Sequence, residues 1–171
     1  MKKTFYLLLA IIAFYGCQSG SANTELNLSE ILASYIESYK NTISVDTTYR
    51  SGNDTVRVQF SYRCLMDSSI VVPRRYVEMY GMDKFVTHNF ASSIIIQKNR
   101  KTVVDRKIVK SDFNAVLEEH LKEYGTLLYP YIYYYADSVR VNYSLSFPLT
   151  DVGIGVSAVI RKDSSVSFSD R

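Results

Sequence analysis

The chain has 171 residues, of which 47% are hydrophobic and 22% are charged, and its formal net charge at pH 7 is +3. This length suits one domain with a sizeable core, and a charge so close to neutrality gives no reason to expect a nucleic-acid partner. The sequence contains no P-loop, GxGxxG, GxSxG, HExxH or CxxC pattern, so it predicts no catalytic residue, no metal site and no cofactor.

Residues 1–16 are predicted to be a lipoprotein signal peptide. Two lysines precede an apolar run at residues 5–15, which is too short to span a bilayer as a helix. The run ends at Gly16-Cys17, which resembles a lipobox, so Cys17 is the predicted site of lipid (palmitate) attachment. The alternative is an ordinary signal peptide with an incidental cysteine.

Residues 17–25 are small and polar, which is typical of a flexible tether between a lipid anchor and a domain. The membrane is thus an expected partner, through the N-terminal anchor. Gln18 stands where an Asp would signal inner-membrane retention, which favours the outer membrane, and the absence of an acidic run favours the periplasmic face. Cys64 is the other mature cysteine, so we expect no internal disulfide and a buried free thiol.

Residues 26–171 are expected to form a single globular domain that begins with a helix and a hairpin. Apolar residues at spacings of three and four favour a helix over residues 26–41, with Ser29 as its cap. Alternation of polar and apolar residues then predicts strands over 43–50 and 55–66, joined by a turn at 51–54. The apolar helix stripe is Ile31, Leu32, Tyr35, Ile36 and Tyr39, and the buried face of the second strand is Val56, Val58, Phe60, Tyr62, Cys64 and Met66.

A second hairpin is predicted after a less regular segment in which Pro73 favours an edge strand or a connection. Residues 85–97 predict one strand with a bulge near 91–93, and residues 102–110 predict its partner after a turn at Asn99. The basic side chains of this hairpin could contact anionic lipid or an acidic partner. We favour instead a solvated edge strand whose cations block the addition of another strand. These bases are Lys98, Arg100, Lys101, Arg106, Lys107 and Lys110, against the single acid Asp105.

Residues 111–125 carry the clearest helical pattern in the chain. Ser111 is the expected cap, Asp112 lies at the positive end and Gly125 ends the helix. The expected apolar stripe is Phe113, Val116, Leu117, Leu121 and Tyr124.

Residues 125–140 read GTLLYPYIYYYADSVR, and four tyrosines alternate within this stretch. We call Tyr129, Tyr131, Tyr133 and Tyr135 the tyrosine row. On a strand, this spacing places all four rings on one face. Pro130 within the row suggests an edge strand or a break in the strand.

The length of the turn around Ala136-Asp137 decides which face the tyrosine row occupies. A turn of two or four residues pairs Tyr133 with Arg140 and Tyr131 with Asn142 on the polar side, whereas a three-residue turn sends the row inward. We favour the even turn because Ser138 does not suit the last position of a three-residue loop. The same register would pair Ile132 with Val141 and Leu128 with Leu145 on the buried side.

An outward tyrosine row is either covered by a helix or open as a platform for sugars or peptides. We expect it to be covered, because two amphipathic helices need a sheet on which to pack. The candidate ligand-binding residues are nevertheless Tyr129, Tyr131, Tyr133, Tyr135, Arg140 and Asn142.

The remaining sequence predicts a strand over residues 138–147 and a final hairpin at 154–160 and 166–168, with Gly153 and Gly155 indicating a bulge. The predicted fold class is therefore α+β and mainly antiparallel β. Roughly eight strands should form a sheet or a small sandwich with two short helices.

The segments IQKNRKTVVDRKIVKSDF and DSVRVNYSLSFPLTDVGIGVSAVIRKDSSVSF carry a resemblance. Together with the Cys17 lipobox, they resemble a family of small lipoproteins of unknown function from Bacteroides-type bacteria. The resemblance implies an envelope location and a similar fold, and it implies no activity.

Three functions remain open at this point. The first is a lipid-anchored, non-catalytic envelope domain that binds a protein or glycan partner. The second is a periplasmic inhibitor or accessory factor of a cell-wall hydrolase. The third is an enzyme whose site is assembled from residues distant in the sequence.

Overall fold

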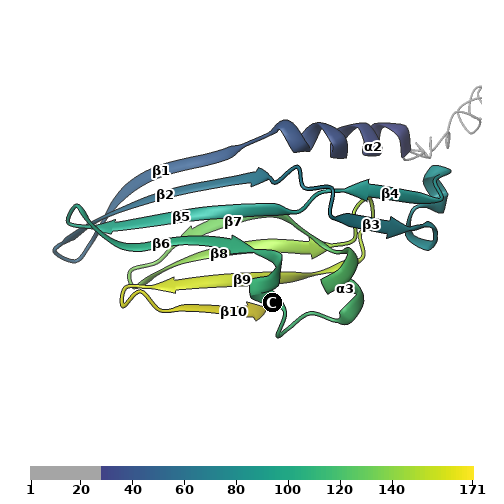
Figure 1. The fold of residues 1–171 in the computed structure, drawn as a ribbon. Coiled ribbons are helices and arrows are strands. Elements are labelled where there is room, and N and C mark those ends of the chain that lie inside the picture. The colour runs from purple at the N-terminus through teal and green to yellow at the C-terminus, as the bar shows by residue number, and fades with distance from the viewer. Residues whose placement is uncertain (1–27) are drawn as a thin grey trace, which may run out of the picture.

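The computed structural model describes residues 28–171, so the predicted signal peptide, lipidation site and tether lie outside the described residues. Within these residues, ten antiparallel strands form two four-stranded sheets and one two-stranded sheet. The two larger sheets pack face to face as a sandwich (Figure 1). The prediction of a mainly antiparallel β fold is confirmed, with more strands than expected.

Each large sheet is built mostly from strands that follow one another in the chain. The first sheet has the order β1-β2-β5-β6 and the second has the order β10-β9-β8-β7. The first sheet comprises β1 (Ile43–Ser51), β2 (Asp54–Cys64), β5 (Phe90–Lys98) and β6 (Lys101–Val109). The second comprises β7 (Thr126–Tyr134), β8 (Ser138–Ser146), β9 (Gly153–Arg161) and β10 (Val166–Asp170).

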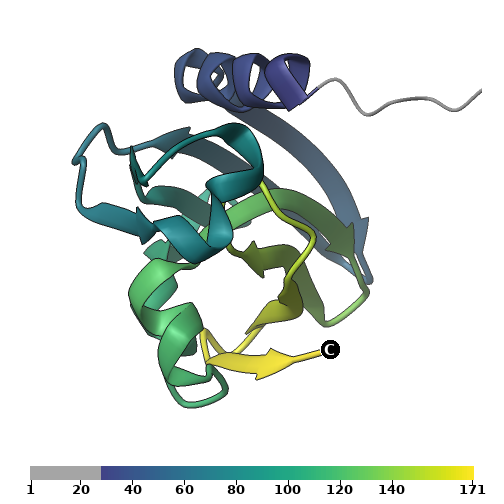
Figure 2. The same ribbon diagram turned by 90° about the vertical axis from the view of Figure 1, so that its right-hand side faces the viewer.

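Short elements close one end of the sandwich. In the end-on view of Figure 2, helix α2 lies at the top and helix α3 at the lower left, whereas the chain ends at the lower right. The small sheet pairs β3 (Ile70–Pro73) with β4 (Lys84–Thr87). The helical elements are α2 (Leu28–Glu37), η2 (Ser38–Lys40), η3 (Arg74–Tyr76), η4 (Glu78–Tyr80), η5 (Lys110–Phe113) and α3 (Glu119–Tyr124).

Alternating residues of both sheets fill one continuous core. Two tyrosines bridge the sheets with hydrogen bonds: the Tyr62 hydroxyl donates to the Leu127 carbonyl at 2.9 Å, and the Tyr143 hydroxyl donates to Ser92 Oγ at 2.9 Å. Burial raises the pKa of both phenols above the usual range, because the ionised form would lose its hydration. Cys64 is buried and free, as predicted, and burial raises the pKa of its thiol.

The predicted helix over residues 111–125 is confirmed only over its last part, where it ends at Gly125 as expected. Residues 110–113 form a 3-10 turn, and only Glu119–Tyr124 are α-helical. Phe113 explains the break: its fully buried ring packs 6.0 Å from the Tyr143 ring and 5.1 Å from the Phe168 ring, in the core. Packing into the end of the sandwich therefore overrides the local helical pattern.

The predicted single strand over residues 85–97 is also wrong, because β4 ends at Thr87 and β5 begins at Phe90. Asp67 holds the chain at this break, where its Oδ1 accepts a hydrogen bond from the Asn89 amide nitrogen at 3.0 Å. The register shift of β5 lies at Ile96/Gln97 rather than at 91–93.

Smaller differences concern single residues in the elements that begin the domain. Ile36 and Met66 were expected to be buried and are exposed. Met66 follows the end of β2 with a positive φ of 54°, so it no longer belongs to the alternating face of the strand. Ser29 lies inside α2 rather than before its first residue.

In the hairpin of β5 and β6, which carries the six bases, β6 is an edge strand of the first sheet, as the favoured interpretation expects. That the cations block strand addition stays a prediction. Asn99 and Arg100 adopt positive φ angles of 50° and 70° in the turn of this hairpin, which confirms the turn at Asn99. Among the described helices, none is long and apolar enough to cross a membrane.

Candidate ligand-binding face

Tyr131 and Tyr133 of the tyrosine row lie on the outer face of the second sheet, on edge strand β7, and Tyr135 follows the end of that strand. The register pairs Tyr131 with Asn142 and Tyr133 with Arg140, as the even turn predicts. Ile132 pairs with Val141 on the buried side. The face predicted from the turn length is therefore confirmed, and Tyr131 and Tyr133 point away from the core.

A bulge at Tyr129-Pro130 changes the register over the first part of β7. Leu127, not Leu128, pairs with Leu145, so the predicted Leu128–Leu145 pair is wrong. Tyr129 adopts a positive φ of 51°, which is consistent with a bulged residue. The cause is Pro130, which has no N–H to donate to the sheet.

The expectation that a helix covers the tyrosine row is wrong. The side chains of Tyr129, Tyr131, Tyr133 and Tyr135 are 74%, 63%, 38% and 43% exposed. Helices α2 and α3 instead lie at one end of the sandwich, opposite the hairpin turns (Figures 1 and 2). The row is therefore an open aromatic surface.

The exposed rings lie against one another along the strand. The ring centroids of Tyr131 and Tyr133 are 4.9 Å apart, and those of Tyr133 and Tyr135 are 6.5 Å apart. The Arg140 guanidinium lies 5.5 Å from the Tyr135 centroid, in cation–π geometry. These contacts reduce the freedom of the rings before any ligand arrives, which lowers the entropic cost of binding.

Small polar side chains form a floor beside the row. The register aligns Tyr131, Asn142, Ser157 and Ser169 across four strands. Ser157 Oγ donates a hydrogen bond to Asn142 Oδ1 at 2.7 Å, and both residues are almost fully buried among larger neighbours. The face is thus a row of aromatic rings above a low, hydrogen-bonding floor.

The two glycines of β9 do not form the predicted bulge, because the β8–β9 register is continuous there. A Cβ atom at Gly153 would lie 2.4 Å from Ser146 Cβ, so the glycine is needed for close approach of the strands. A Cβ at Gly155 would lie 3.3 Å from the Arg171 side chain, which packs over this position.

The outer face leads into a groove beneath helix α2 with a volume of about 760 Å³. Leu128, Leu149 and side chains of α2 line it, and Tyr129 belongs both to the groove and to the tyrosine row. The acids Glu30 and Asp151 also line the groove. The groove and the row therefore differ in charge.

Sequence reasoning missed three residues that share this face. Ser157 and Arg161 come from β9 and pair with β8, whereas Arg171 follows β10 and lies beside Gly155 of β9. The alternation of β9 carried the signal: if Asn142 points outward, so do its partner Ser157 and, four residues later, Arg161.

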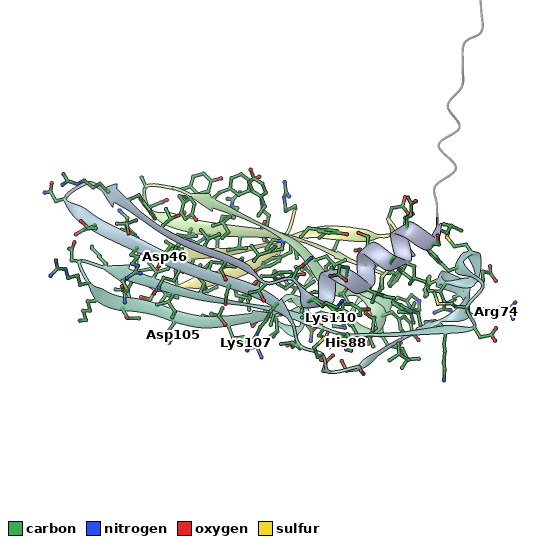
Figure 3. All side chains as sticks on the ribbon, turned by 90° about the horizontal axis from the view of Figure 1, so that it is seen from above. Asp46, Arg74, His88, Asp105, Lys107 and Lys110 are labelled. Carbon is green, nitrogen blue, oxygen red and sulfur yellow. The ribbon has the colours of Figure 1, made fainter. Side chains whose placement is uncertain are left out.

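The other polar surfaces lie elsewhere and are largely satisfied internally. Figure 3 shows Asp46, Asp105 and Lys107 along the first sheet, and Arg74 at the end of the molecule where α2 begins. Asp46 pairs with Arg57, and Arg74 lies 3.2 Å from Asp83. Among residues 28–171, no group of three metal-ligating side chains is close enough to hold a metal ion.

No protein-family model matches this chain, and a comparison with characterised proteins likewise finds no match. The resemblance to small lipoproteins of Bacteroides-type bacteria therefore stays a prediction. Any function must be argued from the side chains of the face itself.

Proposed function

We propose that this chain is a lipid-anchored, non-catalytic domain of the bacterial cell envelope that binds a glycan on the outer face of its second sheet. The observation that carries the proposal is the open tyrosine row, in which Tyr131 and Tyr133 are 63% and 38% exposed. Solvent-exposed aromatic rings in a continuous row are a feature of binding surfaces rather than of a core.

The chemistry of the row fits a sugar chain. A pyranose ring has a flat C–H face that packs on an aromatic ring, and hydroxyl groups at its edge that need hydrogen-bond partners. The tyrosine rings offer the first kind of contact, and the phenol hydroxyls with Ser144 offer the second. A linear glycan can repeat these contacts along the row.

A peptide ligand fits the same face less well. Extended peptides bind by adding a strand to a free sheet edge, with pockets for alternate side chains. Pro130 and the bulge at Tyr129 interrupt the free edge of β7, and the residues beside the row are mostly serine, asparagine and glycine. Short polar side chains favour hydroxyl groups over apolar side chains.

The anchoring part of the proposal rests on the sequence. Cys17 in its lipobox would hold the domain at a membrane, and residues 18–25 would give it reach. Gln18 favours the outer membrane, with the domain on its periplasmic face. The non-catalytic role is supported by the groups on the face, which are phenols, hydroxyls, amides and guanidinium groups rather than an acid–base pair.

The proposal is tested with soluble protein starting at Ser19 and a panel of neutral and acidic polysaccharides that includes purified peptidoglycan and lipopolysaccharide. We expect at least one polysaccharide to retard the protein in affinity electrophoresis. The double variant Tyr131→Ala/Tyr133→Ala should bind it about tenfold more weakly, because two stacking surfaces are lost. Its melting temperature should stay close to that of the wild type, because both rings are exposed.

Tyr134→Ala is the matched control, since this neighbouring tyrosine faces the other side of β7 and packs 5.6 Å from the Tyr49 ring. It should keep its affinity even if its melting temperature falls. Absence of binding across the whole panel would sink the proposal, as would equal loss of binding in the control.

A further inference from the structure

The outer face of the second sheet carries arginines and no acidic residue. The register of the four strands gives its outward positions from end to end. Arg140 lies on β8 and Arg161 on β9, while Arg171 follows β10 and donates its backbone N–H to the Gly155 carbonyl at 3.0 Å. The other outward residues of β8, β9 and β10 are Ser138, Asn142, Ser144, Ser146, Gly153, Gly155, Ser157, Val159, Ser167 and Ser169.

These three guanidinium groups differ from three paired bases of the first sheet, although Arg50, Arg63, Lys101 and Lys107 of that sheet likewise form no salt bridge among the described residues. On and beside that sheet, Arg57, Lys98 and Arg106 each lie within 3.1 Å of a carboxylate oxygen. Among the described residues, Arg140, Arg161 and Arg171 form no salt bridge. Arg140 contacts the Tyr135 ring, and Arg161 Nη1 donates to Ser167 Oγ at 3.1 Å.

The nearest acids stand at the ends of the strands rather than on the face. Asp137 and Asp163 lie in the two turns beside Arg161, where Asp137 accepts a hydrogen bond from Ser138 and Asp163 from the Ser165 amide. Glu30 and Asp151 lie in the groove at the other end. Arg140 and Arg161 lie near the turn end of the strands, and Arg161 adds to the Ser165 hydrogen bonds that lower the pKa of the Asp163 carboxyl. The outward strand positions therefore carry positive charge, and their nearest acids lie in the turns.

The placement of the arginines suits a chain laid across the sheet. Arg140 pairs with Val159, so Arg161 is its diagonal neighbour at about 7–8 Å. Tyr133 is directly opposite Arg140 on the other side. A ligand that stacks on the row thus meets a guanidinium one strand further in.

Arginine at these positions has a chemical meaning. Its planar fork of N–H donors matches a carboxylate in bidentate geometry, which a lysine ammonium cannot do. We propose that the glycan bound on this face is acidic, with uronic-acid carboxylates on Arg140, Arg161 and Arg171 and sugar rings on the tyrosine row. The inference rests on the proposed function and names the chemical class of its ligand.

The experiment is calorimetric titration of the soluble protein with oligogalacturonate and with the same oligomer fully methyl-esterified. The ester keeps the sugar rings and removes the charge. We expect the acid to bind at least tenfold more tightly than the ester, and the difference to shrink as salt is raised from 50 to 500 mM. The double variant Arg140→Gln/Arg161→Gln should lose about three- to tenfold of the affinity for the acid, and little for the ester.

Arg63→Gln is the matched control, because it removes the same charge from the first sheet, where Arg63 is exposed and pairs with Ala91. It should leave the affinity unchanged. Poly-glutamate of similar charge is the second control and should bind at least tenfold more weakly than oligogalacturonate.

Each of the other outcomes contradicts the inference, and each can be told apart from failure of the proposed function. Equal binding of acid and ester, both weakened by Tyr131→Ala/Tyr133→Ala, keeps a glycan-binding domain and removes its preference for acids. Equal binding of poly-glutamate points to an acidic protein instead. Equal loss in Arg63→Gln indicates general charge attraction, and no binding of either oligomer removes the proposed ligand class.

Discussion

Tyrosine has two unrelated roles in this protein, and the face of the sheet on which the side chain lies decides between them. Tyr143 and Tyr133 both lie in the β7–β8 hairpin. Tyr143 is buried and donates to Ser92 across the sandwich, whereas Tyr133 is on the outer face beside Arg140. A phenol in the core must have a hydrogen-bond partner, and a phenol in water need not.

Removing only the Tyr143 hydroxyl tests this difference. Tyr143→Phe should lower the free energy of unfolding by about 1–2 kcal/mol, because Ser92 Oγ loses a buried partner. The measurement is urea denaturation followed by fluorescence. Tyr133→Phe is the control and should change stability by less than about 0.5 kcal/mol. Equal effects of the two variants would contradict the assignment of faces.

At the scale of elements, the pairing within each hairpin determines which side chains share a face of the sheet and which charged side chains lie next to one another. The β1–β2 hairpin is joined on its outer side by Asp46, whose Oδ1 accepts a hydrogen bond from Arg57 Nε at 2.8 Å. Arg57 thereby holds the pKa of the Asp46 carboxyl below its usual range, and Lys98 does the same for Asp54. Among the described residues, the outer face of the second sheet has no such salt bridge, and in our proposal its arginines bind the ligand.

These lowered pKa values predict the acid behaviour of the fold. A carboxyl with a lower pKa in the folded state contributes stability above its usual pKa of 3.8, and this contribution is lost as pH falls through the folded value. The melting temperature should therefore decline between about pH 4 and pH 2. Asp46→Asn should melt lower than the wild type at pH 6 and decline less steeply in acid. Parallel melting curves across this range would show that the pair contributes nothing.

At the scale of the whole molecule, the segment between β6 and β7 closes the sandwich. It carries the chain from the first sheet to the second, and Phe113 inserts between them with its ring near those of Tyr143 and Phe168. Tertiary packing fixes this segment, since its only regular helix has six residues, too few to be stable alone.

Truncation of this residue is therefore expected to affect the entire fold. Phe113→Ala should reduce the free energy of unfolding by about 3–5 kcal/mol, because a fully buried aromatic ring leaves a cavity between the sheets. Guanidinium denaturation measures the change. Met79→Ala removes a comparably large but exposed side chain and should have little effect. A small effect at Phe113 would mean that the sandwich end repacks without it.

The sequence by itself determined the hairpins and the face of the tyrosine row. Alternation and turn residues act between neighbours in the chain, so the parity of the turn at Ala136-Asp137 was enough to send Tyr131 and Tyr133 outward. The same local reasoning failed at residues 111–125 and at Leu128. In the first case the core competed with helix propensity, and in the second a bulge at Pro130 changed the register.

Only the tertiary structure decided whether the row is covered and which charges lie beside it. Both depend on elements far apart in the sequence: helices α2 and α3 lie at one end of the sandwich, and β9 and β10 bring Arg161 and Arg171 to the face of Tyr131. The physical reason is that the exposure of a side chain and the electrostatic field around it depend on all neighbours in space. The periodicity of a sequence reports only the neighbours along the chain.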